Sequence, residues 1–137
     1  MAALGGALGA LARWALAEAL PHSPGSWPWA TLLVNLVGCL LIGVLLAVLL
    51  ARFPKSRWMR PFLAVGVLGG FTTYSTFAVD VVRLTGAGRG PLAVAYVVVS
   101  VLGGVLAVLV GLLTARAVLH AVDTLDDELR AGEGEES

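Results

Sequence analysis

The residues best suited to chemistry stand in the middle of an apolar run. Residues 69–77 read GGFTTYSTF and interrupt the run of residues 62–84. Adjacent glycines and hydroxyl side chains weaken a helix, because glycine costs backbone entropy and Ser/Thr side chains compete for backbone hydrogen bonds. At membrane depth, irregular backbone is tolerated where it is buried or lines a polar path, and broken helices direct carbonyl groups at ions. The segment therefore predicts an ion site at a helix break.

The elements that must hold this segment are transmembrane helices. Of the 137 residues, 58% are hydrophobic and 13% are charged, and the mean hydropathy is +0.91. Roughly 20 helical residues cross about 30 Å of hydrocarbon, and four apolar stretches reach or approach this length: residues 2–20, 29–51, 62–84 and 92–118. We expect an all-α membrane protein whose residues 1–120 form four transmembrane helices, the third broken near the bilayer midplane.

The ends and connections agree with this plan. The first stretch lacks the charged n-region and small-residue cleavage site of a signal peptide, so we expect it to remain as a helix. Trp27, Trp29 and Trp58 flank the second and third stretches, as in the aromatic belts at membrane interfaces. Residues 121–137 are acidic and end in GEGEES, and this composition predicts a disordered tail, to which we assign no function.

Polar side chains also occur inside two other stretches. Thr31 and Asn35 share one face of the second, and Tyr96 and Ser100 share one face of the fourth. A buried Asn is costly in hydrocarbon unless its amide is hydrogen-bonded, and alone it would serve equally well to join helices. Together with the break in the third stretch, these residues predict a polar track. Four helices hardly enclose such a path, which favours a twofold dimer.

Small residues predict where helices approach closely. Gly5 and Gly9 form a GxxxG pair in the first stretch, and Cys39 is best explained as a small packing residue. His22 and His120 are isolated, so no Cys/His metal cluster is expected, and a net charge of zero gives no support for nucleic-acid binding. The fourth stretch carries a stripe at intervals of three or four: Tyr96, Ser100, Gly104, Ala107, Gly111 and Thr114.

Three motifs resemble those of the Fluc/CrcB family of fluoride channels. They are GGALGALARW at residues 5–14, TLLVNLVG at residues 31–38 and the segment at residues 69–77, and the spacing of Tyr96, Ser100 and Gly104 agrees with them. The resemblance covers nearly the whole chain up to about residue 118. It implies a passive, fluoride-selective channel of the cell membrane that exports cytoplasmic fluoride, built as an antiparallel, dual-topology homodimer with two pores.

The resemblance also implies roles for individual residues. Backbone carbonyls of Gly69 and Thr72 would hold a structural sodium ion at the dimer centre. Ring edges of Tyr74 and Phe77, which are electropositive, would replace water around the anion. Arg13 would raise the anion concentration in a vestibule, or would snorkel to the interface or pair with Glu18. The remaining members of the implied anion pathway are the amide of Asn35 and the hydroxyls of Thr31, Tyr96 and Ser100.

Three positions leave questions open. Tyr74 stands where the family usually has phenylalanine, and Gly104 stands where some members continue the hydroxyl track. Asp80 follows Phe77 by one turn and could line the pore or act as a structural acceptor.

Other classes of function fit less well. An enzyme is not expected, because the sequence has no nucleophile–base pair, metal cluster or phosphate loop. A proton-coupled multidrug exporter needs a carboxylate deep in the first stretch, but Glu18 lies near its end and the deeper charge is Arg13. A non-conducting assembly subunit is a third possibility, in which the break would serve only packing.

Charge is distributed unequally between the two ends of the predicted bundle. The end away from both termini carries Arg83 and Arg89. An excess of Lys and Arg on one side sets the insertion direction, so the count favours an inside amino terminus and raises pairing with an oppositely oriented paralogue as an alternative to the homodimer. The end shared by both termini carries Arg52, Lys55, Arg57, Arg60 and Arg116.

Overall fold

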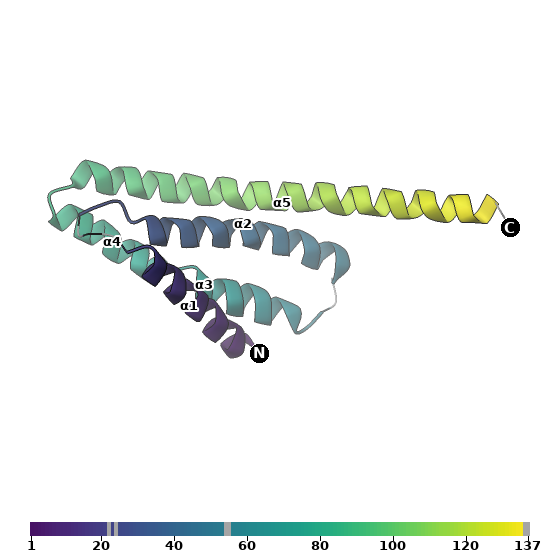
Figure 1. Ribbon diagram of the computed structural model, residues 1–137, viewed down its shortest axis with the longest axis horizontal. Coiled ribbons are helices and arrows are strands. Elements are labelled where there is room, and N and C mark those ends of the chain that lie inside the picture. The colour runs from purple at the N-terminus through teal and green to yellow at the C-terminus, as the bar shows by residue number, and fades with distance from the viewer. Residues whose placement is uncertain (22, 24, 54–55, 136–137) are drawn as a thin grey trace.

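The computed structural model describes residues 1–21, 23, 25–53 and 56–135, and every regular element among them is a helix. His22 and Lys55, named above, lie outside the described residues. Figure 1 shows the arrangement. In chain order the elements are α1 (Ala2–Ala19), α2 (Trp29–Arg52), the π-helix η1 (Arg60–Leu68), α3 (Gly69–Phe71), α4 (Tyr74–Gly86) and α5 (Gly90–Glu135).

Among the described residues, three segments are long and apolar enough to cross a membrane: Trp29–Arg52, Arg60–Gly86 and Gly90–Ala131. They correspond to the second, third and fourth predicted spans. Helix α1 is formed as expected, but its 18 residues include Arg13 and Glu18, and it is not among the three. Its crossing of the membrane stays a prediction.

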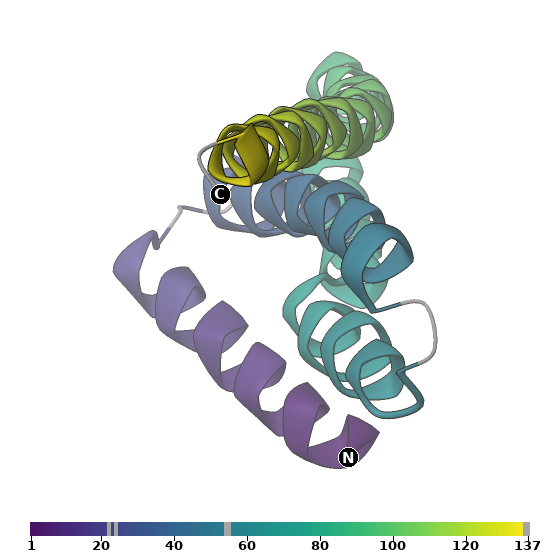
Figure 2. The same ribbon diagram turned by 90° about the vertical axis from the view of Figure 1, so that its right-hand side faces the viewer.

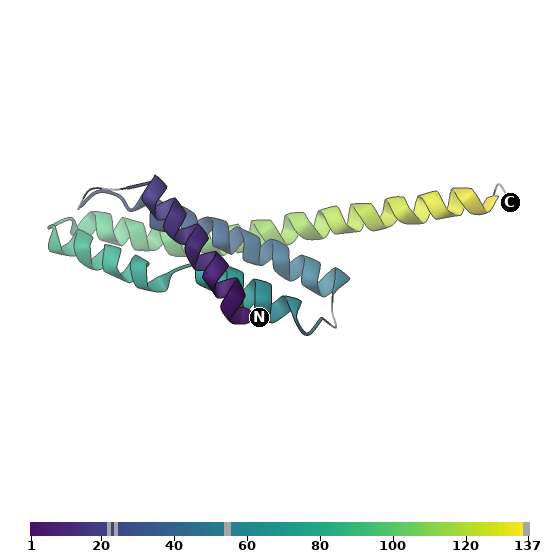
Figure 3. The ribbon, with the colours of Figure 1, turned by 60° about the horizontal axis from the view of Figure 1, so that its bottom comes forward.

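Helices α2 and α5 run parallel to each other and make the most extensive contact of the fold, as Figures 1 and 3 show. Glycine allows their backbones to touch. A Cβ at Gly43 would collide with the carbonyl oxygen of Val108, and a Cβ at Gly111 would collide with that of Leu40. Close approach through small residues drives helix association in lipid, where the hydrophobic effect gives little help.

Helix α1 packs on the first half of the broken span. It lies against η1 and α3, away from α5 (Figure 2). Gly5 faces the backbone of Phe62 and Val67, and Gly9 faces that of Val67 and Phe71. The GxxxG pair is therefore a packing surface, as predicted, and it holds α1 directly beside the break.

The third apolar run breaks where the sequence predicts. Helix α3 ends at Phe71, the next two residues are extended (Thr72 ψ 156°; Thr73 φ −146°, ψ 120°), and α4 begins at Tyr74. Thr73 caps α4, since its Oγ1 accepts a hydrogen bond from the Thr76 amide at 3.1 Å. The π-helical form of η1 was not predicted, because nine residues are too few for sequence periodicity to separate the two helix types.

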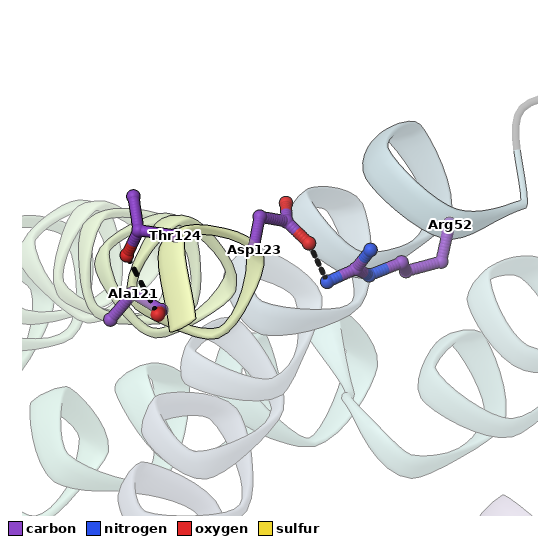
Figure 4. A network of polar contacts seen from close by, with 4 residues as sticks. All are labelled: Arg52, Ala121, Asp123 and Thr124. Carbon is purple, nitrogen blue, oxygen red and sulfur yellow. Dashed lines mark hydrogen bonds and ion pairs between the residues drawn. The ribbon is translucent and has the colours of Figure 1, made fainter. Parts of the chain in front are cut away.

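The described part of the acidic segment is helical, so the predicted disorder is wrong there. Helix α5 continues to Glu135 and projects beyond the other helices (Figure 1). Leu, Ala, Glu and Arg favour helix, and extending a helix already formed avoids the cost of nucleation. An ion pair between Arg52 and Asp123 ties the extension to the end of α2 (Figure 4). The division of the chain at residue 120 stays a prediction.

Candidate ion pathway

The side chain of Asn35 holds the break in place. Its Nδ2 donates to the carbonyl oxygen of Thr73 at 3.0 Å, and its Oδ1 accepts from the Thr73 amide at 2.8 Å. One side-chain amide thereby satisfies both backbone groups of an extended residue, as a neighbouring strand would do. An NH₂ group has two hydrogens, so this arrangement leaves Asn35 a second donor.

The same hydrogen bonds release two backbone carbonyls. In a continuous helix, the amide of residue i+4 donates to the carbonyl of residue i. The Thr73 amide donates to Asn35 instead of Gly69, and the Thr76 amide donates to Thr73 Oγ1 instead of Thr72. The carbonyls of Gly69 and Thr72 thus lose their helical donors. These two are the carbonyls for which the family resemblance implies a cation.

A groove of about 470 Å³ lies beside the break and collects most of the predicted pathway residues. The ring centroids of Tyr74 and Phe77 are 6.0 Å apart, with an interplanar angle of 41°. The walls therefore combine neutral hydrogen-bonding groups and aromatic rings and lack a formal charge. The polar and aromatic residues that line the groove are Asn35, Thr72, Thr73, Tyr74, Phe77 and Ser100.

Two predicted residues lie at a separate hollow of about 290 Å³. Arg13 from α1 and Thr31 from α2 line it, together with Thr73 and Thr76. Thr31 and Asn35 are one helical turn apart, but Thr31 lines this hollow and Asn35 lines the groove. Thr73 is the residue that borders both spaces. Within one subunit, the Asn35–Thr73 pair therefore separates the arginine hollow from the aromatic groove.

Tyr96 is the centre of a buried cluster instead of a groove wall. It is 0% exposed, with its ring centroid 5.3 Å from that of Phe77 and 5.7 Å from that of Trp27, which meets it edge-on at 86°. The hydroxyls of Tyr96 and Ser100 are both buried, and the Tyr96 hydroxyl lies within interaction distance of those of Ser100 and Thr31. The three hydroxyls therefore form a buried polar cluster beside the groove.

Asp80 acts as a hydrogen-bond acceptor, which is one of the two roles that the sequence left open. It is 1% exposed, and its Oδ2 accepts a hydrogen bond from Thr31 Oγ1 at 2.7 Å. The bond joins α2 to α4 across the bundle. It also commits the Thr31 hydroxyl hydrogen to a carboxylate, so that Thr31 has no second hydrogen for an anion.

Thr73 and Trp27 contribute to the site but are not among the residues that the sequence predicts for the pathway. Thr73 caps α4 and pairs with Asn35, and Trp27 packs on Tyr96. A signal for the first was present, because Thr73 precedes Thr76 at the spacing of a helix N-cap and its third residue. For Trp27 the sequence indicates only an anchor at the membrane interface.

Residues 1–112 match the protein family described as CrcB-like protein, Camphor Resistance (CrcB). The chain belongs to the CrcB family. The match includes the break, both hollows and the Tyr96 cluster, whereas the last part of α5 lies outside it.

Similar proteins are named as fluoride-specific ion channels. FluC 2 of Streptomyces avermitilis is 50% identical to this CrcB chain over 94 residues, which cover 69% of the chain but only 60% of that relative. FluC 1 of Streptomyces coelicolor is 46% identical over 117 residues, covering 85% and 76% of the two chains. FluC 1 of Mycobacterium bovis is 46% identical over 114 residues, covering 83% and 86%.

Proposed function

We propose that this CrcB chain is a fluoride-specific ion channel of the cell membrane that lets fluoride leave the cytoplasm passively. The observation that carries the proposal is the groove beside the break, whose neutral donors and aromatic rings suit a small anion that has lost its water. Weak donors placed one after another along a path favour conduction, because a strongly bound ion would not leave. The names of the relatives supply fluoride as the ion.

The subunit is proposed to act as an antiparallel dimer. Tyr74 is 82% exposed although it borders the groove, and the groove is open to its surroundings in a single chain. A second copy related by a twofold axis would cover the open side, and in an isologous pair both grooves would be covered.

Efflux from liposomes tests the function directly. Purified protein should release fluoride rapidly and chloride scarcely, with no proton gradient imposed. Protein-free liposomes, and liposomes made permeable with a detergent, set the lower and upper limits. Equal rates for the two anions, or exchange that runs only on a proton gradient, would exclude the proposed channel.

Phe77→Ile is expected to lower fluoride flux by about tenfold, the effect of roughly 1.4 kcal/mol on a barrier. The side-chain volume is nearly retained, while the electropositive ring edge is lost. The measurement is the initial efflux rate per reconstituted protein. Val79→Ala, at a position 45% exposed on the same helix, is the control and should conduct normally. Undiminished flux through the Ile variant would remove the ring from the mechanism.

Sodium is proposed as a structural ion held by the carbonyls of Gly69 and Thr72. When bound, the ion would offset the charge of carbonyl oxygens that lack helical donors, and two from each of two subunits would give four oxygen ligands. Thr72→Ser should preserve sodium-dependent flux. Backbone atoms are the ligands, and Ser retains the hydroxyl that donates to Leu68 O at 2.9 Å.

The test is fluoride efflux after complete replacement of sodium by a large organic cation on both membrane faces. We expect activity to fall and to return when sodium is restored. Unchanged flux after full exchange would contradict the sodium proposal while leaving the fluoride proposal intact.

Insertion is expected to be biased toward an inside amino terminus. The reason is that the excess of Lys and Arg lies at the end of the bundle where Arg57 and Arg60 are found. Ser56→Cys, in a chain with Cys39→Ala, gives a single label site at that connection. Unequal labelling by a membrane-impermeant thiol reagent from the two faces of the cell membrane is the expected result. Subunits in the two orientations would still form the antiparallel homodimer, and the subunits in excess would be free to pair with an oppositely oriented paralogue. Equal labelling would eliminate the bias and leave the antiparallel homodimer.

A further inference from the structure

A second groove, of about 440 Å³, runs between α2 and η1. Leu46 and Leu50 on one side are 44% and 49% exposed, and Val65 on the other is 69% exposed. The groove is almost entirely apolar and shares only Ile42 with the groove at the break. It is therefore distinct from the candidate ion pathway.

The mouth of this groove carries a positive charge. Arg60, at the start of η1, lines it, and the exposed Arg57 lies in the connection just before it. Arg52 is already paired with Asp123, so it does not contribute a free charge. Trp58, 70% exposed between the two remaining arginines, is a residue type that concentrates at the headgroup level of a bilayer.

These features describe a slot with an apolar floor in the hydrocarbon and a cationic rim at the membrane surface. A sterol or a neutral lipid would fill the floor but would make no use of the rim. Basic pockets at the ends of transmembrane helices bind anionic lipid headgroups, and each Lys or Arg near the surface contributes about a fivefold gain in binding.

We propose that this groove binds an anionic glycerophospholipid, with one acyl chain between α2 and η1 and the phosphate at Arg60 and Arg57. The proposal does not depend on which ion the protein conducts. Ala64, an exposed residue of η1 that lines the groove, offers a way to fill the slot without touching the charged rim.

The test is lipid retention. Protein reconstituted in equal amounts of phosphatidylglycerol and phosphatidylcholine is extracted in mild detergent, and the lipids that remain bound are counted by mass spectrometry. We expect phosphatidylglycerol to be enriched. Arg60→Gln should lower that enrichment about fivefold, whereas Arg89→Gln, which removes the same charge at the other end of the bundle, should leave it unchanged.

Filling the groove separates the apolar contact from the charge. Ala64→Phe should remove the retained phosphatidylglycerol, while Ala117→Phe, at an exposed position of α5, should not. Circular dichroism and size exclusion show whether each variant is folded and associated. Equal retention of both lipids by the unaltered protein would overturn the proposal. A folded Ala64→Phe variant that loses its dimer instead of its lipid would also overturn it, and would assign the groove to a second copy of the chain.

Discussion

Asn35→Ala should abolish most fluoride flux and lower stability at the same time. The substitution removes a donor from the groove and leaves the amide and carbonyl of Thr73 without their partners. Each buried polar group left unsatisfied costs roughly 1–3 kcal/mol. We expect flux to fall by more than about tenfold, which corresponds to roughly 1.4 kcal/mol on the barrier, together with a clear decrease in the thermal unfolding temperature.

Asn35→Asp distinguishes the role of Asn35 as a donor to the anion from its role as a partner of the Thr73 backbone. The carboxylate can still accept from the Thr73 amide, but it cannot donate to the Thr73 carbonyl and it repels an anion. Flux should therefore be lost with a smaller loss of stability than in the Ala variant. Val37→Ala, two residues along at a position 42% exposed, is the control and should change neither quantity much. Normal flux through either Asn35 variant would show that the bridge across the break is dispensable.

Gly9→Ala is expected to be the most damaging glycine-to-alanine change among the described glycines. A Cβ at this position would collide with the carbonyl oxygen of Val67 and lie 2.7 Å from the amide nitrogen of Phe71. Neither is a side chain that can rotate away, so α1 must separate from η1 and α3. Overpacking of this kind costs typically about 1–3 kcal/mol, occasionally more.

Gly6→Ala is the matched control in the same helix. A Cβ at Gly6 would have no neighbour within 4 Å, and replacing glycine by alanine inside a helix gains up to about 1 kcal/mol of intrinsic propensity. Thermal unfolding in detergent should therefore separate the two variants in opposite directions. Fluoride flux should follow stability, because α1 packs beside the break. Equal unfolding temperatures would contradict the close contact between α1 and the broken span.

The sequence by itself determined the class of protein, the place of the break and the faces on which helices meet. These properties are local. Adjacent glycines followed by hydroxyl residues weaken a helix whatever surrounds them, and the break falls at Thr72 and Thr73 as expected. Glycines spaced four apart make a smooth helix face, and Gly5 and Gly9 do contact another backbone.

The helical state of the acidic segment was missed for a related reason. Composition measures the tendency of an isolated segment to be disordered, whereas residues after Asp123 extend a helix that is already formed. The contact that ties this extension to the bundle joins Arg52 and Asp123, which are 71 residues apart in sequence. A compositional argument takes no account of such a contact.

Only the tertiary structure decided which polar groups pair and which spaces they line. Asn35 and Thr73 are 38 residues apart, and Thr31 and Asp80 are 49 residues apart. Whether these side chains meet depends on the depth and rotation of α2 relative to the broken span, where Gly38 of α2 lies against the Thr72 side chain. The sequence placed Thr31 and Asn35 on one helix face, but packing gave them different partners: the carboxylate of Asp80 in α4 for Thr31, and the backbone of Thr73 at the break for Asn35.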